Sequence, residues 1–174
     1  FRDSRRMYVA GVPAIINRLS FTGELGYEIY VAPHYQIKLY EELMEAGKEF
    51  NIKPFGSRAL MSMRLEKNWG AWTLDYRPDF TPKETGLDLF INWDKDFIGK
   101  NSAQKDESKN KIIPLIVETN EIDVTYNEAV MKDEKSIGYI TSGGFAHFVN
   151  KSVAFSYLDT KELNSGKGIQ VEIN

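Results

Sequence analysis

The sequence predicts an α+β protein in which a mixed helix-and-strand portion is followed by a small β-barrel. Helical and strand patterns alternate in the earlier part of the chain, whereas the later part contains only short strands separated by turn residues. All seven arginines lie at or before Arg77, and the later part uses lysine alone. We therefore expect two units, residues 1–105 and residues 106–174, the second of them truncated.

The composition bounds what the chain can do. With 174 residues, of which 42% are hydrophobic, it can bury a core. The 25 acidic and 22 basic residues leave a net charge of −3, which gives no electrostatic reason to expect a nucleic-acid or membrane partner. The chain has no cysteine, so disulfides, thiol nucleophiles and cysteine-based metal sites are excluded. His34 and His147 lie far apart and lack nearby acidic ligands, so we expect no metal site.

Two expectations concern the context of the chain. The longest apolar run, residues 7–16, has ten residues and is too short to span a membrane, and we recognise no targeting signal. We therefore expect a cytoplasmic protein. The chain begins with Phe1 and ends in what reads as the middle of a strand, so we expect a piece of a longer polypeptide.

The first elements are predicted by periodicity. Residues 8–19 and 28–32 are rich in Tyr, Val and Ile and predict two strands, joined by a glycine-containing turn over residues 22–26. Residues 35–50 predict an amphipathic helix. Its apolar face consists of Leu39, Tyr40, Leu43, Met44 and Gly47.

A second helix is predicted from Ser57, as the N-cap, to about Lys67. Arg58 would lie in its first turn, where the helix dipole disfavours a cation. Residues 69–76 then predict extended backbone, and Thr81 followed by Pro82 predicts the start of a short helix.

In the later part, polar residues 99–111 predict a short helix or linker. Pro114 predicts an edge strand or a bulge, and the run of Ser142, Gly143 and Gly144 predicts a turn. The predicted strands are residues 111–118, 127–132, 135–141, 152–158 and 168–173.

One carboxylate stands out. Glu28 opens a predicted strand, and strand alternation places it on the same face as Tyr30, opposite Tyr27 and Ile29. A carboxylate in this position either faces water or is held by hydrogen-bond donors.

Several stretches resemble, in order, the signature segments of the glycine-cleavage aminomethyltransferase (T-protein) family. They cover nearly the whole chain and comprise residues 18–31, 54–60, 63–67, 80–87, 96–100, 138–144 and 151–154. Residues 11–14 and 65–72 are most similar to the carboxy-terminal region of the flavin-dependent dimethylglycine and sarcosine dehydrogenases within that family.

The resemblance implies a function. In such dehydrogenases an amino-terminal flavin domain oxidises an N-methyl amine to an iminium ion. The carboxy-terminal region then captures the one-carbon unit on tetrahydrofolate and gives 5,10-methylenetetrahydrofolate. It implies that this chain forms the second half of the mixed α/β portion and most of the final barrel. The expected partners are folate, a one-carbon unit from a methylated amine and the remainder of the polypeptide. FAD would bind to that remainder and not to this chain.

The resemblance also implies site residues. By position, Glu28 matches the family glutamate, whose carboxylate accepts both the ring N–H and the exocyclic amine of the pterin. Arg58 matches the family arginine near the start of the second helix; the alternative is a surface salt bridge, for instance to Glu28. Phe21 matches a position that is often Tyr, so it keeps the apolar contact but lacks the hydroxyl. Tyr27 is a further candidate to line the pocket.

Other roles stay open. Trp69 and Trp72 are candidates for the pocket as well, with core packing as the alternative. The family aspartate that acts on the folate would precede this chain, so the catalytic residues are unknown and the fragment alone should be nearly inactive.

The alternatives are a stand-alone aminomethyltransferase of the glycine cleavage system and a non-catalytic folate-binding module. The non-catalytic relatives that assist iron–sulfur assembly carry a cysteine motif, which this chain lacks. A general protein-interaction module is a further alternative.

Overall fold

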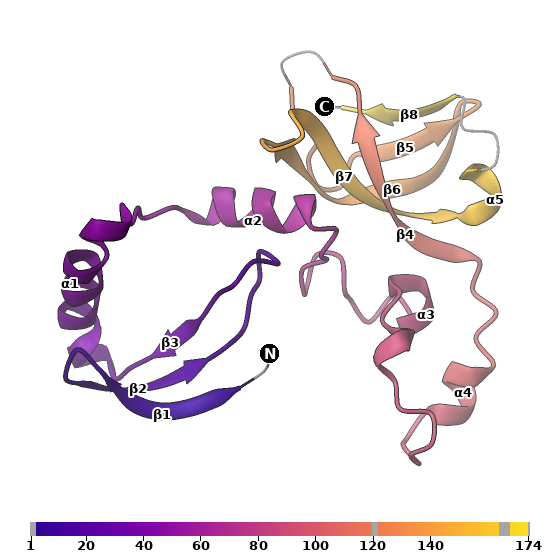
Figure 1. Cartoon of the computed structure of the whole chain (residues 1–174). Helices are drawn as coiled ribbons and strands as arrows, with labels where there is room; N and C mark the ends of the chain where they lie inside the picture. Colours follow the sequence, from indigo (N-terminus) through magenta and orange to yellow (C-terminus); the bar gives the residue numbers. More distant parts are fainter. Residues whose placement is uncertain (1–2, 120–121, 164–167, 174) are drawn as a thin grey trace. The chain divides into compact units, whose positions relative to one another are not determined.

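The computed structural model describes residues 3–119, 122–163 and 168–173. The chain divides into two compact units, Phe1–Lys67 and Asn68–Asn174 (Figure 1). Mixed helices and strands precede a sheet of short antiparallel strands, as the α+β prediction requires.

The first unit contains a three-stranded antiparallel sheet. Its strands are β1 (Ser4–Val9), β2 (Val12–Asn17) and β3 (Glu28–Tyr30), in the order β1-β2-β3. The prediction of a single strand over residues 8–19 is wrong. Ala10 and Gly11 both have positive φ, 49° and 76°, and form a two-residue hairpin turn between Val9 and Val12.

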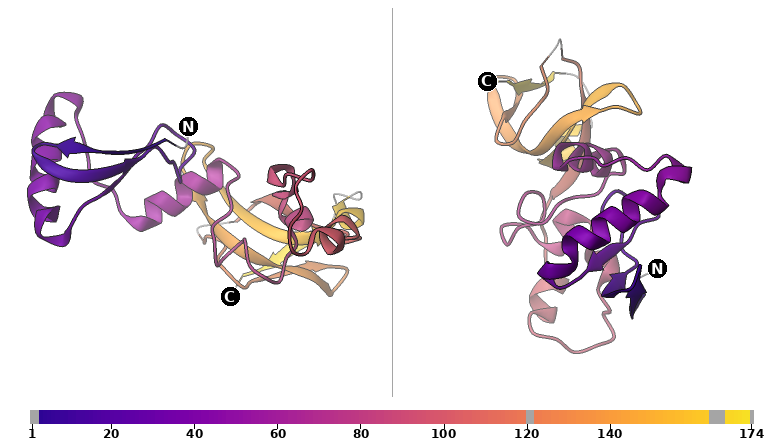
Figure 2. Two further views of the ribbon diagram at one scale, coloured as in Figure 1. Left: turned by 90° about the horizontal axis from the view of Figure 1, so that it is seen from below. Right: turned by 90° about the vertical axis from the view of Figure 1, so that its left-hand side faces the viewer.

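Helices complete this unit. A 3-10 turn (Pro33–Tyr35) leads into α1 (Gln36–Ala46), and a second 3-10 turn (Lys48–Phe50) precedes α2 (Ser57–Glu66). Helix α1 lies beside the hairpin end of the sheet (Figures 1 and 2). Leu39 of α1 is buried, as are Val12 and Ala14 of β2, whereas Tyr40 is 55% exposed, contrary to the predicted apolar face.

The N-cap of helix α2 lies one residue earlier than predicted. Its N-cap is Gly56, which has no side chain to bond the first backbone N–H groups, so the prediction of Ser57 as the cap is wrong. Ser57 is instead the first helical residue, and Arg58 lies in the first turn, as expected.

The second unit is built on a five-stranded antiparallel sheet in the order β4-β7-β6-β5-β8. The five predicted strands are confirmed as β4 (Asn110–Val117), β5 (Ala129–Lys132), β6 (Lys135–Ala146), β7 (Lys151–Asp159) and β8 (Ile169–Glu172). Pro114 lies on the edge strand β4, as predicted. The strands β4 and β8 at the two ends of this order line one common hollow of about 740 Å³, so the sheet curls toward a barrel.

The prediction of a turn at residues 142–144 is wrong, because these residues lie inside β6. A Cβ at Gly143 would overlap the carbonyl oxygen of Val124, so glycine serves close backbone packing here. The register between β6 and β7 also shifts between Ile140 and Ser142. The turn residues of this hairpin follow later, at residues 147–150.

The core of the second unit consists of completely buried apolar side chains: Val124, Val130, Ile140, Ala154 and Leu158. Beside them lies a polar network around Asp75, which is also completely buried. Its carboxylate accepts hydrogen bonds from Thr141 (2.5 Å), Ser142 (2.8 Å) and the backbone N–H of Ala71 (2.8 Å). Burial of a carboxylate is tolerated because its acceptors are satisfied.

Residues 69–76 were expected to be extended, but they form a compact turn. The backbone N–H groups of Asp75 and Tyr76 both donate to the carbonyl of Ala71, and only a single bridge joins Trp72 to Tyr76. Tyr157 donates to the carbonyl of Asp75 over 2.8 Å. Burial, followed by the Asp75 charge, raises the pKa of the Tyr157 hydroxyl above its usual range.

Short helices connect this turn to the sheet. They are α3 (Pro82–Thr85), a 3-10 turn (Asp88–Phe90), α4 (Lys100–Gln104) and, after β7, α5 (Thr160–Leu163). The predicted start of α3 is confirmed, with Thr81 as N-cap, Pro82 in the first turn and a reciprocal bond between Thr81 and Glu84. In the described part of the chain, no helix has the length and apolar character needed to cross a bilayer.

Candidate functional site

The register of the first sheet assigns its side chains to two faces. Glu28 lies opposite Asn17, and Tyr30 opposite Ile15, whereas Ile29 lies opposite Ile16. Since neighbouring residues of a strand alternate, Glu28 and Tyr30 share one face and Ile29 lies on the other. This alternation was predicted from the sequence and is confirmed.

Glu28 is exposed at the start of β3. Tyr30 donates a hydrogen bond of 2.5 Å to its Oε2 atom. This bond, together with the negative charge of Glu28, raises the pKa of Tyr30 above its ordinary value of 10.0. Among the described residues no cation pairs with Glu28, so its carboxylate keeps acceptor positions for a ligand.

Arg58 is exposed in the first turn of α2. Within the described residues its guanidinium forms no hydrogen bond or ion pair, so the alternative of a salt bridge to Glu28 is not observed. The guanidinium is therefore available to an anionic or carbonyl-bearing ligand.

Phe21 is half-buried in the loop between β2 and β3. This loop is held by the far end of α2, because a Cβ at Gly23 would lie 2.7 Å from Cγ of Lys67, and Lys67 pairs with Glu24 over 2.5 Å. Arg58 lies at the opposite end of the same helix, about 13 Å away along its axis. The structure thus brings the Phe21 loop to the far end of α2, and among the described residues no hydrogen bond or ion pair joins Arg58 to this loop.

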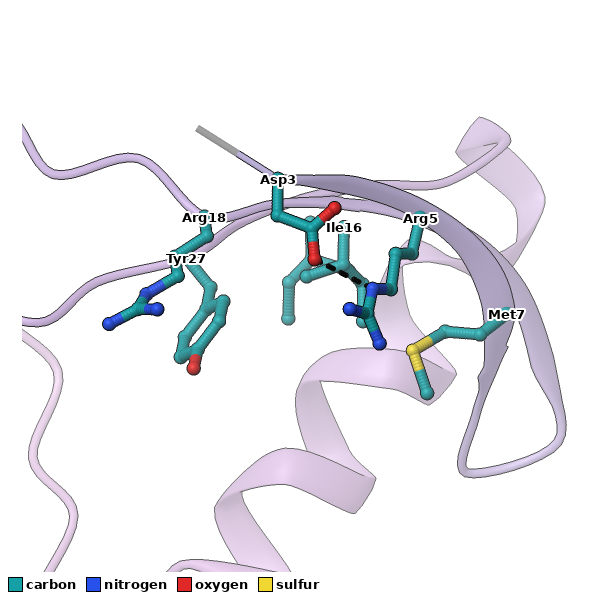
Figure 3. A pocket seen from close by; sticks show the side chains of 7 residues that line it. Asp3, Arg5, Met7, Ile16, Arg18 and Tyr27 are labelled. Atoms are coloured by element: carbon teal, nitrogen blue, oxygen red, sulfur yellow. Dashed lines mark hydrogen bonds and ion pairs between the residues drawn. The ribbon is translucent and has the colours of Figure 1, made fainter. Parts of the chain in front are cut away.

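Tyr27 lines a hollow on the face opposite Glu28 (Figure 3). The hollow has a volume of about 470 Å³ and is lined by Asp3, Arg5, Met7, Ile16, Arg18, Tyr27 and Ile29. Of the four predicted site residues, only Tyr27 is among these lining residues; Glu28, Arg58 and Phe21 are not.

Sequence reasoning missed Arg5 and Arg18. The signal lies in the spacing of Asp3, just before β1, and of Arg5 and Met7 within it, because residues two apart in extended backbone share one face. That pattern could be used only after recognising the hairpin at Ala10, which places β1 beside β2.

The remaining candidates, Trp69, Trp72, His34 and His147, are not among the residues that line the hollow beside Tyr27. Trp72 is 74% exposed and packs edge-on to Tyr76, with ring centroids 5.5 Å apart, and Trp69 is 40% exposed. His34 and His147 are both exposed. The described residues contain no group of three or more acidic or histidine side chains that could hold a metal ion.

Comparison with known proteins covers both parts of the chain. Residues 1–95 match the family model of the GCVT N-terminal domain, and residues 110–174 match that of the glycine cleavage T-protein C-terminal barrel domain. The predicted boundary at residue 105 lies between these two matches, whereas the division into compact units falls after Lys67.

Individual relatives agree with the models. The mitochondrial dimethylglycine dehydrogenase of Homo sapiens is 34% identical over 99% of this chain, which covers 21% of that protein. An aminomethyltransferase of Thermoanaerobacter pseudethanolicus is 33% identical over 99% of this chain, which covers 47% of it. The crystal structure of the glycine cleavage system aminomethyltransferase T from Bartonella henselae matches with a TM-score of 0.80 and 25% identity, covering 92% of this chain and 46% of that one. The chain therefore spans about half of these aminomethyltransferases and about a fifth of the dehydrogenase.

Proposed function

Because the chain belongs to the glycine cleavage T-protein family, we propose that it is the tetrahydrofolate-binding part of a flavin-dependent dimethylglycine- or sarcosine-type dehydrogenase. In that role it places tetrahydrofolate where a one-carbon unit from a methylated amine is transferred to it, giving 5,10-methylenetetrahydrofolate. The similarity to human dimethylglycine dehydrogenase over 99% of the chain supports this proposal.

The observation that carries the proposal is the state of Glu28. Its carboxylate is exposed, is oriented by Tyr30 and pairs with no cation among the described residues. The pterin of tetrahydrofolate carries a ring N–H and an exocyclic amine side by side, and one carboxylate accepts both. Such charge-assisted bonds contribute about 1.5–3 kcal/mol when the ligand shelters them from water.

The other site residues have distinct roles in the proposal. Arg58 binds a polar group of the folate, and Phe21 contributes an apolar contact. A contact with Tyr27 requires the ligand to pass around the outer edge of β3, because Tyr27 and Glu28 face opposite sides of the sheet. Strand β3 is at the end of its sheet, so no further described strand pairs with that edge.

The chemistry of the whole protein needs parts beyond this chain. We place the catalytic aspartate and the FAD site in the remaining polypeptide, and the chain alone lacks the complete catalytic set. The boundary between the folate-binding portion and the barrel stays a proposal near residue 105. The predicted cytoplasmic location also stays a prediction, whereas the human relative is named a mitochondrial protein.

A stand-alone aminomethyltransferase is the second candidate. It is favoured by the Thermoanaerobacter relative, of which this chain covers 47%. The two candidates differ in one property of the full-length protein: the dehydrogenase contains bound flavin, whereas the aminomethyltransferase does not. An absorption spectrum of the purified full-length protein distinguishes them. The non-catalytic folate-binding relatives with a cysteine motif are disfavoured, because this chain contains no cysteine.

Calorimetric titration of the chain with 5-formyltetrahydrofolate tests the folate assignment. We expect saturable binding of the whole ligand and of its pterin half, because both carry the two pterin donors. Absence of saturable binding by 5-formyltetrahydrofolate would refute the assignment, and failure of the pterin half to bind would refute the role of Glu28.

A further inference from the structure

The hollow opposite Glu28 is built from neighbouring rows of the first sheet. Arg5 of β1 lies opposite Ile16 of β2, which in turn lies opposite Ile29 of β3. The next row toward the open end of the sheet carries Asp3 and Arg18, joined by a bond of 2.8 Å from the Arg18 backbone N–H to the Asp3 carbonyl. Arg5 and Arg18 are thus diagonal neighbours on one face, a separation within reach of long side chains.

The charges of this hollow do not balance. Arg5 Nε pairs with Asp3 Oδ2 over 2.7 Å, which neutralises one guanidinium. The side chain of Arg18 forms no hydrogen bond or ion pair with any described residue. In Figure 3 the side chains of Arg18 and Tyr27 lie side by side, and the Arg18 guanidinium is directed away from the Asp3–Arg5 pair. One cation and one phenolic O–H are therefore available at the same place.

The rest of the lining is apolar. Met7, Ile16 and Ile29 contribute the hydrocarbon part of the lining. The volume of about 470 Å³ is within the range of small-molecule sites. A planar guanidinium beside an apolar floor favours a carboxylate carried on an apolar body, because the head can be bound bidentately while the body displaces water.

We propose that this hollow binds a small organic acid, with its carboxylate on Arg18 and the hydroxyl of Tyr27, and its apolar body on Ile16 and Ile29. This hollow lies on the face opposite Glu28, the carboxylate of the proposed pterin site, and Tyr27 is the one residue that both assignments name. Failure of either assignment leaves the other standing.

Titration of the chain with phenylacetate, followed by calorimetry or ligand-observed NMR, tests the site. We expect saturable binding of phenylacetate, no binding of phenylacetamide, and weakening by about tenfold or more in Arg18→Gln. Arg6→Gln is the matched control, because Arg6 of β1 lies opposite Ile15 and so carries the same charge on the other face of the same sheet. It should bind phenylacetate as the wild type does.

Three results would overturn the proposal: no saturable binding, equal affinity in Arg18→Gln and wild type, or equal affinity for phenylacetamide. Saturation by inorganic phosphate with the affinity of phenylacetate would also overturn it, since phosphate lacks the apolar body. If Arg18→Gln fails to fold by circular dichroism, Tyr27→Phe decides the question. Loss of the hydroxyl should weaken phenylacetate binding, and unchanged affinity would contradict the assignment.

Discussion

Tyr30 donates a hydrogen bond of 2.5 Å to Oε2 of Glu28, two residues before it on β3. Both side chains lie on the same face of the sheet, so the bond orients the carboxylate without burying it. A carboxylate has about four acceptor positions, so Tyr30 leaves room for two donors of a ligand. The strand thereby holds Glu28 ready for a bidentate contact.

The titration of Tyr30 tests this bond. Because Glu28 raises the pKa of Tyr30, the bond stabilises the folded chain below the ordinary tyrosine pKa of 10.0, and this stabilisation is lost as the pH rises through the raised pKa. In Glu28→Gln the pKa of Tyr30 should fall toward its ordinary value. Carbon-13 NMR of the tyrosine Cζ atoms, with Tyr30→Phe to assign the signal, measures it; an unchanged pKa in Glu28→Gln would contradict the contact.

Arg58→Gln should weaken folate binding without destabilising the chain. Arg58 forms no hydrogen bond or ion pair with the described residues, and it lies where the dipole of α2 disfavours a cation. We expect a change in unfolding free energy below about 0.5 kcal/mol by urea denaturation. Lys53→Gln, which removes an exposed cation before α2, is the control and should leave folate affinity unchanged. A stability loss without an affinity loss would assign Arg58 a structural role instead.

Gly143→Ala should destabilise the second unit. The new Cβ would overlap the carbonyl oxygen of Val124, which is backbone and cannot easily move. Overpacking of this kind costs about 1–3 kcal/mol in unfolding free energy, measured by urea denaturation. Gly56→Ala, where nothing lies within 4 Å of the new Cβ, should cost less than about 1 kcal/mol. Equal effects of the two substitutions would show that the close approach at Gly143 is absent.

The carboxylate of Asp106, which precedes β4, should make the stability of the folded chain sensitive to acid. Hydrogen bonds from the side chain of Ser108 and then of Thr81, with the backbone N–H of Ser108, lower the pKa of Asp106 to about 2. Because this pKa is lowered, the ionised carboxylate stabilises the folded state above the ordinary pKa of 3.8, and this stabilisation is lost as the pH falls toward 2. Asp106→Asn should therefore show a shallower loss of stability between these pH values in urea unfolding. A slope identical to that of the wild type would show that Asp106 does not contribute.

Local sequence patterns were sufficient to predict most of the helices and strands. The amphipathic α1, the capping box at Thr81 and all five strands of the second sheet have local signals that the structure confirms. Two of the wrong predictions concern glycines, each of which has two possible structural roles. Gly11 makes a hairpin inside an apolar run, because Ala10 accepts positive φ without the usual Asn or Asp. Gly143 reads as a turn but serves close packing inside β6.

The site could be predicted only in part. Alternation alone placed Glu28 and Tyr30 together and Tyr27 on the other face. The hollow containing Arg18 depends on the register of β1 against β2, which a missed hairpin hides. The approach of the β2–β3 loop to Lys67 joins residues far apart in sequence, and no local pattern indicates it.

The affinity of Glu28 variants for 5-formyltetrahydrofolate tests the central claim most directly. Glu28→Ala should weaken binding about thirtyfold, and Glu28→Gln by a similar factor, because an amide offers one acceptor and one donor where the pterin needs two acceptors. Glu41→Ala, which removes an exposed carboxylate from α1, should leave the affinity unchanged. Equal affinities of wild type and Glu28→Ala would contradict the account.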